Sequence, residues 1–171
     1  MPDPIPLPGS TRANLIAAGL RFFAAAGYAA VEVDVLAAAA GVTVGALYHH
    51  FRSKAHFYGV LRDEMTQRLL DRIEAAAAAV EPGARVRAAL LATFDGALRI
   101  QAGKLISDPD PRPIPDPIAA ALSRLAAADG RAAAETLGFL LAATLRAALL
   151  RVEVAPDDQA EARTALEQLV R

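Results

Sequence analysis

Apolar residues recur along most of the chain at intervals of three or four positions, the spacing that places them on one face of an α-helix. The clearest run follows Ser53 and consists of Phe57, Leu61, Met65, Leu69 and Ile73. Glycine, proline and short polar breaks separate such runs, and alanine is abundant. Because alanine is the strongest helix former, the pattern predicts an all-α protein.

The breaks also give the expected limits of each helix. Ser10 or Thr11 is a suitable N-cap for the first helix, Thr43 for the third and Ser53 for the fourth, while Gly27 and Gly41 are suitable ends. We expect helices at about 11–26, 33–40, 44–50, 54–80, 84–106, 118–127, 131–152 and 156–170.

One strong change of composition interrupts the second half of the chain. The segment "SDPDPRPIPDP", residues 107–117, has a proline at every second position from Pro109. Proline blocks helix formation, so this segment is expected to be a loop. With the proline-rich start of the chain, it suggests an extended arm at 1–9, a small head domain at 10–55, and a helical body at 56–171 that contains the loop at 107–117.

Charge and composition remove several classes of function. The formal net charge of −1 gives no general attraction to nucleic acid or anionic membranes, so charge has to be considered locally. The absence of cysteine excludes disulfides and thiolate metal sites and favours a cytoplasmic protein. The first residues do not resemble a signal peptide, and charged residues break up each candidate membrane span.

Catalysis finds little support in the sequence. There is no nucleophile elbow, no phosphate-binding glycine loop and no helix with paired inward carboxylates. His49, His50 and His56 lack the spacing and the carboxylate neighbours of a metal site. We therefore expect neither an enzyme nor a bound cofactor or metal.

The stretch "AAAAGVTVGALYHHFRSKAHF", residues 37–57, contains the most informative motif. A short helix ends at Gly41, and a second short helix begins after the potential cap Thr43. Two short helices joined in this way are typical of a helix-turn-helix, whose second helix enters the major groove of DNA. The segment from Thr43 to Lys54 has two basic residues and no acidic one.

Residues 12–61 resemble the DNA-binding domain of the TetR family of bacterial transcriptional regulators. The segments that support the resemblance are "AAGLRFFAAAGY", "LAAAAGVT" and "GALYHHFRSKAHF". It implies an N-terminal three-helix helix-turn-helix domain followed by a helical ligand-binding and dimerisation domain. It also implies a homodimer that binds a double-stranded DNA operator, acts as a repressor and is released by a small apolar ligand.

The resemblance assigns DNA-binding roles to one short segment. The residues concerned are Thr43, Val44, Gly45, Ala46, Tyr48, His49 and Lys54. His50 and Phe51 match positions that pack the domain. Val31 and Glu32 stand where the family has hydroxyl residues that cap the second helix and bind phosphate, and Val44 replaces a polar residue. These departures leave an alternative open, in which the fold is kept, DNA binding is lost, and the chain binds a ligand or a protein partner.

Two further sets of residues belong to the body. The resemblance suggests that a ligand binds among its helices, and the candidate residues are Tyr58, Met65, Phe94, Leu98, Gln101, Phe139 and Thr144; a packed core is the alternative. The helix expected at 131–152 is apolar around most of its surface, which favours a dimer interface. The candidates are Leu137, Leu141, Leu145, Ala148, Leu149, Val152, Leu166 and Leu169, and the alternative for them is a core within the chain.

Overall fold

The computed structural model describes residues 9–170, so the arm expected at 1–9 lies almost wholly outside the described residues. Within this range the chain is helical and contains no strand, as the sequence predicts. The helices are α1 (Thr11–Ala30), α2 (Val33–Ala39), α3 (Val44–Phe51), α4 (Lys54–Ala78), α5 (Arg85–Arg99), α6 (Gly103–Ser107), α7 (Pro117–Ala128), α8 (Ala134–Val154), a 3₁₀ turn η1 (Pro156–Asp158) and α9 (Gln159–Leu169).

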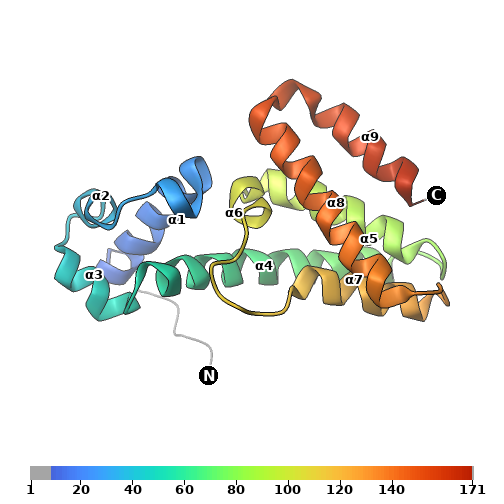
Figure 1. Cartoon of the computed structure of the whole chain (residues 1–171), viewed down its shortest axis with the longest axis horizontal. Helices are drawn as coiled ribbons and strands as arrows, with labels where there is room; N and C mark the ends of the chain where they lie inside the picture. The colour runs from blue at the N-terminus through green and yellow to red at the C-terminus, as the bar shows by residue number, and fades with distance from the viewer. Residues whose placement is uncertain (1–8, 171) are drawn as a thin grey trace.

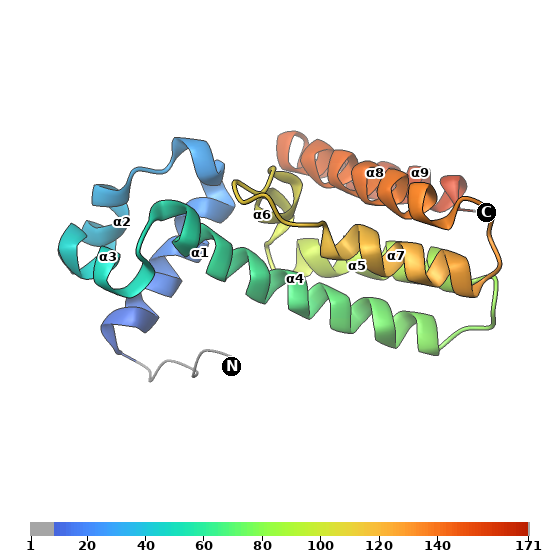
Figure 2. The same cartoon turned by 60° about the horizontal axis from the view of Figure 1, so that its bottom comes forward.

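The helices form a small head at one end of the molecule and a larger helical body at the other (Figure 1). The head contains α1, α2 and α3, and the body contains α5 to α9. The long helix α4 starts beside α3 and continues into the body, so it belongs to both parts (Figures 1 and 2). The short helix α6 lies between the head and the body, next to α1.

Three of the predicted caps are present. Ser10, Thr43 and Ser53 each accept a hydrogen bond from the backbone N–H three residues later, at donor–acceptor distances of 3.2, 3.2 and 3.0 Å. Each such bond satisfies one of the free N–H groups in the first turn of a helix. Asp116 caps α7 in the same way. These local bonds explain why the limits of the head helices are readable from the sequence.

The single helix expected at 84–106 is wrong, because the structure has two helices there. Helix α5 ends at Arg99, and Gln101 takes a left-handed φ of 54°. The Ala102 N–H donates to the carbonyl of Ala97 over 2.8 Å, which closes the helix end and turns the chain. This turn brings Leu105 and Ile106 into the core, where both are about 1% exposed. Burial of these side chains favours the break, which helical spacing alone does not reveal.

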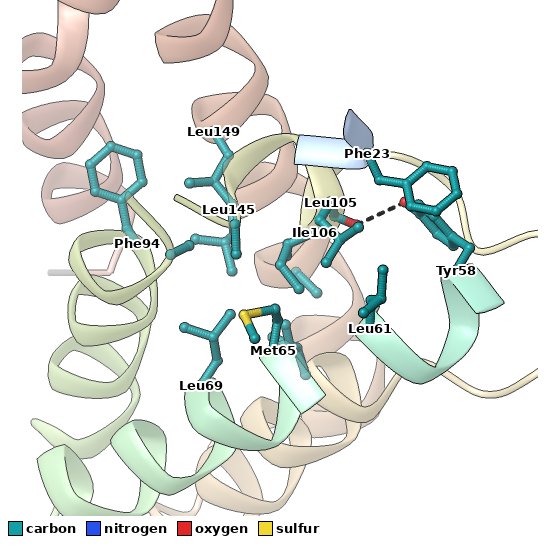
Figure 3. Close-up of a cluster of buried hydrophobic side chains, with 14 of the residues drawn as sticks. Phe23, Tyr58, Leu61, Met65, Leu69, Phe94, Leu105, Ile106, Leu145 and Leu149 are labelled. Atoms are coloured by element: carbon teal, nitrogen blue, oxygen red, sulfur yellow. Dashed lines mark hydrogen bonds between the residues drawn. The ribbon is translucent and has the colours of Figure 1, made fainter. Parts of the chain in front are cut away.

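The head is joined to α4 by an aromatic cluster. The Phe23 ring packs edge-on against the rings of Phe57 and Tyr58, with centroid distances of 5.9 and 5.1 Å. Gly19 allows this approach, because a Cβ there would collide with Phe57 and Leu61. From this cluster the buried side chains continue without interruption through α6 to Leu145 and Leu149 of α8 (Figure 3).

The buried guanidinium of Arg62 connects α4 to α6 and to the chain that follows it. It donates to the carbonyl oxygens of Leu105, Ile106 and Asp108, the last over 2.7 Å. Its Nε lies 3.3 Å from Oδ2 of Asp110. The positive charge of Arg62 therefore lies at the C-terminus of α6. This position is favourable because the last carbonyl groups of a helix have no partners within the helix and carry a partial negative charge.

Asp108 extends this connection to the head. One of its carboxylate oxygens accepts a hydrogen bond from the Tyr28 N–H over 3.2 Å, and the other lies 2.9 Å from Lys104 Nζ. Gly27 has a left-handed φ of 77°, and a Cβ at this position would overlap the Asp108 carboxylate. We call Arg62, Lys104, Asp108 and the Tyr28 amide the junction.

Two ionisable groups beside the junction have shifted pKa values. Burial raises the pKa of the Tyr58 hydroxyl, which donates to the Leu105 carbonyl over 3.1 Å. Hydrogen bonds from the Arg112 side chain lower the pKa of Asp110. Arg112 also holds Asp63 of α4 through two bonds of 2.8 and 2.7 Å. The start of the proline-rich connection, residues 108–116, is thus tied to α4 by charge-assisted bonds.

By length and composition alone, α1 is apolar enough to cross a membrane, and it is the only such helix among the described residues. Arg12 and Arg21 interrupt it less than was expected from the sequence. Helices that pack on a protein core pass the same test, so the finding is weak. Here Leu15, Gly19 and Phe23 are buried, and Gly27 kinks the helix.

Helices α7 and α8 pack at very short range through Gly138. A Cβ at this position would meet the backbone nitrogen of Ser123 and the carbonyl of Ala119, two atoms that cannot move without shifting α7. Gly45 of α3 is the opposite case, because a Cβ there would enter open space.

We expect Gly138→Ala to destabilise the protein by about 1 to 3 kcal/mol, the usual cost of overpacking a tight contact. Gly45→Ala is the matched control and should leave the stability unchanged or raise it slightly, since alanine favours the helix. Urea unfolding followed by circular dichroism measures both. Equal stability of the two variants would contradict the close packing of α7 on α8.

Candidate nucleic-acid interface

Helices α2 and α3 are joined by a tight turn at Gly41. Gly41 has a left-handed φ of 70°, and the Gly41 and Val42 N–H groups donate to the carbonyls of Ala38 and Ala37 over 3.0 and 2.9 Å. These bonds close the end of α2 and reverse the chain direction. The helix–turn–helix arrangement expected from the sequence is therefore present, at the end of the molecule farthest from the body (Figure 1).

Helix α3 has a buried face and an exposed face. Leu47 and Phe51 are no more than 1% exposed, and the Phe51 ring stacks on Phe57 with a centroid distance of 4.2 Å. The residues expected to contact DNA lie mostly on the other face: Thr43, Val44, Gly45, Tyr48 and His49 are exposed, and Ala46 is half-buried. Tyr48 has 42% of its surface exposed, which is high for an aromatic residue.

Gly45 has no packing reason to be glycine. It has an ordinary helical conformation, and the nearest atom to a Cβ built there is Thr43 Oγ1, at 3.8 Å. Glycine costs stability inside a helix relative to alanine. Because Gly45 has no side chain, another molecule can approach the backbone closely at the start of α3.

The segment between α3 and α4 is fixed by its own hydrogen bonds. Arg52 takes a left-handed φ of 58° and is exposed. His56 Nδ1 donates to the Phe51 carbonyl over 2.7 Å, and the Ser53 hydroxyl caps α4. The N-terminus of α4, which has a partial positive charge, is thereby held beside the exposed face of α3.

Lys54 lies at the start of α4 but is not simply directed at solvent. Its Nζ lies 4.6 Å from the centre of the Tyr28 ring, and the residue is half-buried. A cation over an aromatic face is attracted by about 0.5 to 1 kcal/mol or more, depending on how far it is removed from water. This contact holds the charge next to the head, and it was not foreseen from the sequence.

The start of α2 lacks a side-chain cap. Glu32 occupies the N-cap position without such a bond, and it is exposed. Asp34 partly compensates, since its carboxylate accepts from the Val35 N–H over 2.9 Å. Two acidic side chains therefore lie at the beginning of α2, where a phosphate would otherwise be favoured.

The residues proposed for ligand binding do not converge on one cavity. Tyr58 and Phe94 are fully buried in the core. Met65, Leu98 and Gln101 line one cleft between α1 and the body. Phe139 is 64% exposed beside the proline-rich connection, and Thr144 lines a groove between α8 and α9.

The predicted interface residues divide into two groups. Leu141, Leu145, Leu149, Val152 and Leu166 are at most 8% exposed and belong to the core of the chain itself. Their burial within one chain is the alternative that the sequence left open. Leu137 and Ala148 are half-buried, and Leu169 is 63% exposed. The helix spacing predicted that these residues are buried, but it did not distinguish the core of one chain from a contact between two.

Some residues on the surface of the head were not expected there from the sequence. Arg52 follows α3, and Val35 of α2 is 44% exposed. Arg12 lies over the Phe51 ring at 5.4 Å from its centre. The basic residues were visible in the sequence, but only the fold shows that they border α3.

Among residues 9–170 no group of three or more histidine or acidic side chains is placed to hold a metal.

The head and the whole chain each match known proteins. Residues 15–59 match the family model described as bacterial regulatory proteins, tetR family. The whole fold is similar to a putative tetR family transcription regulator from Shewanella sp. PV-4, with a TM-score of 0.69, 20% identity, and coverage of 94% of this chain and 96% of that one. A search among curated proteins finds no match.

Two further solved structures show the same likeness. A TetR-family transcriptional regulator from Pectobacterium atrosepticum has a TM-score of 0.68 and 25% identity, with coverage of 94% and 92% of the two chains. SmeT in complex with triclosan has a TM-score of 0.64 and 18% identity, with coverage of 94% and 89%. The chain thus has the fold of TetR-family transcriptional regulators, and the family-model match to bacterial regulatory proteins of the tetR family lies in its N-terminal head.

Proposed function

We propose that the protein is a sequence-specific DNA-binding regulator that acts as a homodimer. The observation that supports this most is the exposed face of α3, where Gly45 and Tyr48 are both unexplained by packing within the chain. A recognition helix in a helix-turn-helix presents such a face to the major groove. Binding to double-stranded DNA implies a cytoplasmic protein.

Each exposed residue has a role that fits its chemistry. Val44 and Ala46 are apolar and suit the methyl group of thymine, the apolar feature of the major groove. Tyr48 and His49 are hydrogen-bond donors that can reach phosphates or base edges. Thr43 caps α3 and lies at the same end of the helix. Lys54, at the start of α4, would bind a phosphate together with the helix N-terminus.

Dimerisation would use the exposed face of α8 and α9. Leu140 and Leu150 of α8 and Leu169 of α9 are 54%, 46% and 63% exposed. Ala147 and Leu169 border an apolar groove of about 260 Å³ between these two helices. Apolar surface of this kind favours association with a second copy. The interface would therefore use these residues in place of the five buried leucine and valine positions.

Release from DNA would follow a change in the spacing of the two heads. Half-sites on DNA lie one helical turn apart, about 34 Å, and only one head spacing fits them. A small molecule that binds the free form better shifts the protein towards it. The relative SmeT has been solved with triclosan, which supports a small apolar ligand here. We infer repression from the resemblance to the TetR family alone; a ligand that removes the protein from DNA would then permit transcription.

The first test is binding to duplex DNA from the region upstream of the protein's own gene. We expect wild-type protein to bind with an affinity that falls with salt, and Tyr48→Ala combined with Lys54→Ala to weaken binding at least tenfold, about 1.4 kcal/mol. The salt dependence should also become shallower, by about 0.9 in log–log slope for each phosphate that the variant no longer neutralises. Fluorescence anisotropy across a salt series measures both.

Two further variants make this test specific. Gly45→Ala should weaken binding while the fold stays stable, since its Cβ projects only towards DNA. Arg124→Gln removes an exposed charge on α7 and should bind like the wild type. Weak binding of the wild type that none of these substitutions changes would refute the proposal. The chain would then be a TetR-like fold that binds a ligand or a protein partner.

Substitution of Glu32 is expected to strengthen DNA binding, in contrast to the substitutions above. Glu32→Ser supplies a cap for α2 and should raise the free energy of unfolding by about 0.5 to 1 kcal/mol. It also removes a negative charge near the expected phosphate, so DNA binding should tighten. Glu32→Gln is the matched control, which should tighten DNA binding without the gain in stability. A loss of affinity in both variants would mean that Glu32 itself contacts DNA.

The dimer is tested by placing charge on the proposed interface. Ala147→Arg combined with Leu169→Arg should shift the protein to a monomer in sedimentation equilibrium at micromolar concentration. Both residues are exposed in the single chain, so its fold should survive. Ile114→Arg with Ala120→Arg, also at exposed positions, is the control and should remain dimeric. A wild-type monomer would exclude the proposed interface.

A further inference from the structure

A cleft of about 640 Å³ lies between the head and the body, beside α6. Its walls come from α1, α4, the turn between α5 and α6, and the end of α8. Its volume is in the range of small-molecule sites, about 300 to 1,000 Å³. The core of the body, in contrast, is filled by side chains such as Phe94 and Leu145 (Figure 3).

The floor of the cleft is apolar. Met65 of α4 and Leu105 of α6 are 3% and 1% exposed, and Leu98 of α5 is half-buried beside them. Covering such a floor removes apolar surface from water, at about 25 cal/mol for each Å². An occupant with a compact apolar part is therefore favoured here.

The rim carries a positive charge that the described residues leave without an acidic partner. Arg21 of α1 is exposed, its guanidinium lies 4.9 Å from the centre of the Phe22 ring, and it makes no ion pair within residues 9–170. Arg68 also lines the cleft, but it pairs with Glu64 over 2.6 Å. The one acidic side chain in the wall is Glu153, which lies against Gly103 and makes no ion pair with Arg21.

Gln101 gives the cleft a second unusual feature. It lines the wall and takes a left-handed φ of 54°, a conformation that normally favours glycine. Its side chain is exposed and supplies both a donor and an acceptor at the mouth. The turn that ends α5 sets this backbone conformation, and it holds the Gln101 side chain beside the cleft.

The cleft also adjoins the junction. Leu105 in its floor offers its carbonyl to Arg62 and Tyr58, and α6 ends at Asp108, which holds the Tyr28 amide of the head. A molecule in the cleft would touch α1 on one side and α6 on the other. Its binding energy would therefore act directly on the contact that sets the position of the head.

We propose that this cleft is the effector site, and that it takes a small amphipathic molecule with one negative charge. The apolar part lies on Met65, Leu98 and Leu105, and the anionic group pairs with Arg21. The effect on DNA rests on the proposed function, whereas binding itself does not.

Two fluorescent probes test the charge requirement. The anion 8-anilinonaphthalene-1-sulfonate and the neutral N-phenyl-1-naphthylamine share the same ring system and differ in the sulfonate. We expect saturable binding of both to the wild-type chain. Arg21→Gln should weaken the anionic probe about tenfold, equivalent to about 1.4 kcal/mol, and leave the neutral probe unchanged. Arg124→Gln is the matched control and should change neither.

Two matched alanine substitutions locate the bound probe. Ala24→Leu fills the cleft and should remove most of the binding of both probes, while Ala165→Leu in the groove between α8 and α9 should not. Circular dichroism of each variant verifies that it is folded. Binding that disappears in Ala165→Leu and persists in Ala24→Leu would overturn the proposal, as would an absence of saturable binding or an equal effect of Arg21→Gln on both probes.

The outcome for DNA is measured separately. Anisotropy of a red-labelled duplex, with and without the anionic probe at saturation, shows whether occupancy weakens DNA binding. If the protein binds the probes as expected but does not bind duplex DNA, the ligand site is supported and the proposed function is refuted. If the protein binds duplex DNA but shows none of the expected probe effects, the proposed function is supported and the ligand site is refuted.

Discussion

The position of the head depends on one buried guanidinium. Arg62 of α4 is 7% exposed, and a buried charge is costly unless hydrogen bonds and an opposite charge satisfy it. The carbonyls at the end of α6 and the Asp110 carboxylate meet this requirement together. They can do so only if α6 turns back onto α4. This constraint, together with the burial of Leu105 and Ile106, favours the break after α5 and places Asp108 beside the head.

This arrangement gives the two ends of the molecule different surfaces. The aromatic cluster around Phe23 makes α1 and α4 one rigid support, and α3 presents its exposed face on that support. The body has an apolar outer face on α8 and α9, which we propose for a second copy of the chain. The junction and the cleft beside it lie between the two parts, next to α4 and the aromatic cluster, so a small molecule bound there would contact both parts. Small shifts at such a packed contact have to be taken up by the whole head.

The helices of the head are well predicted because their signals are local. Ser10, Thr43 and Ser53 bond to backbone groups three residues away, and Gly41 takes the left-handed conformation that ends α2. Gly27, expected to end α1, only kinks it, and the helix continues to Ala30. The exposed positions of α3 also follow from the motif. Two properties of the interface do not: the Lys54 ammonium lies over Tyr28, and Gly45 has open space above it. The first depends on a residue far away in the sequence, and the second depends on the absence of other helices next to Gly45.

By itself the sequence determined the all-α class and the limits of the helix-turn-helix, because capping and helical periodicity act over a few residues, while the residues expected on its exposed face came from the resemblance to the TetR family. The tertiary structure decided the division of α5 from α6, the destination of the apolar side chains of α8, and the position of the cleft. Leu145 and Leu169 have the same chemistry, yet one is buried in the core and the other is 63% exposed. Hydrophobic burial depends on which surfaces meet, and that is settled by contacts between residues distant in the chain.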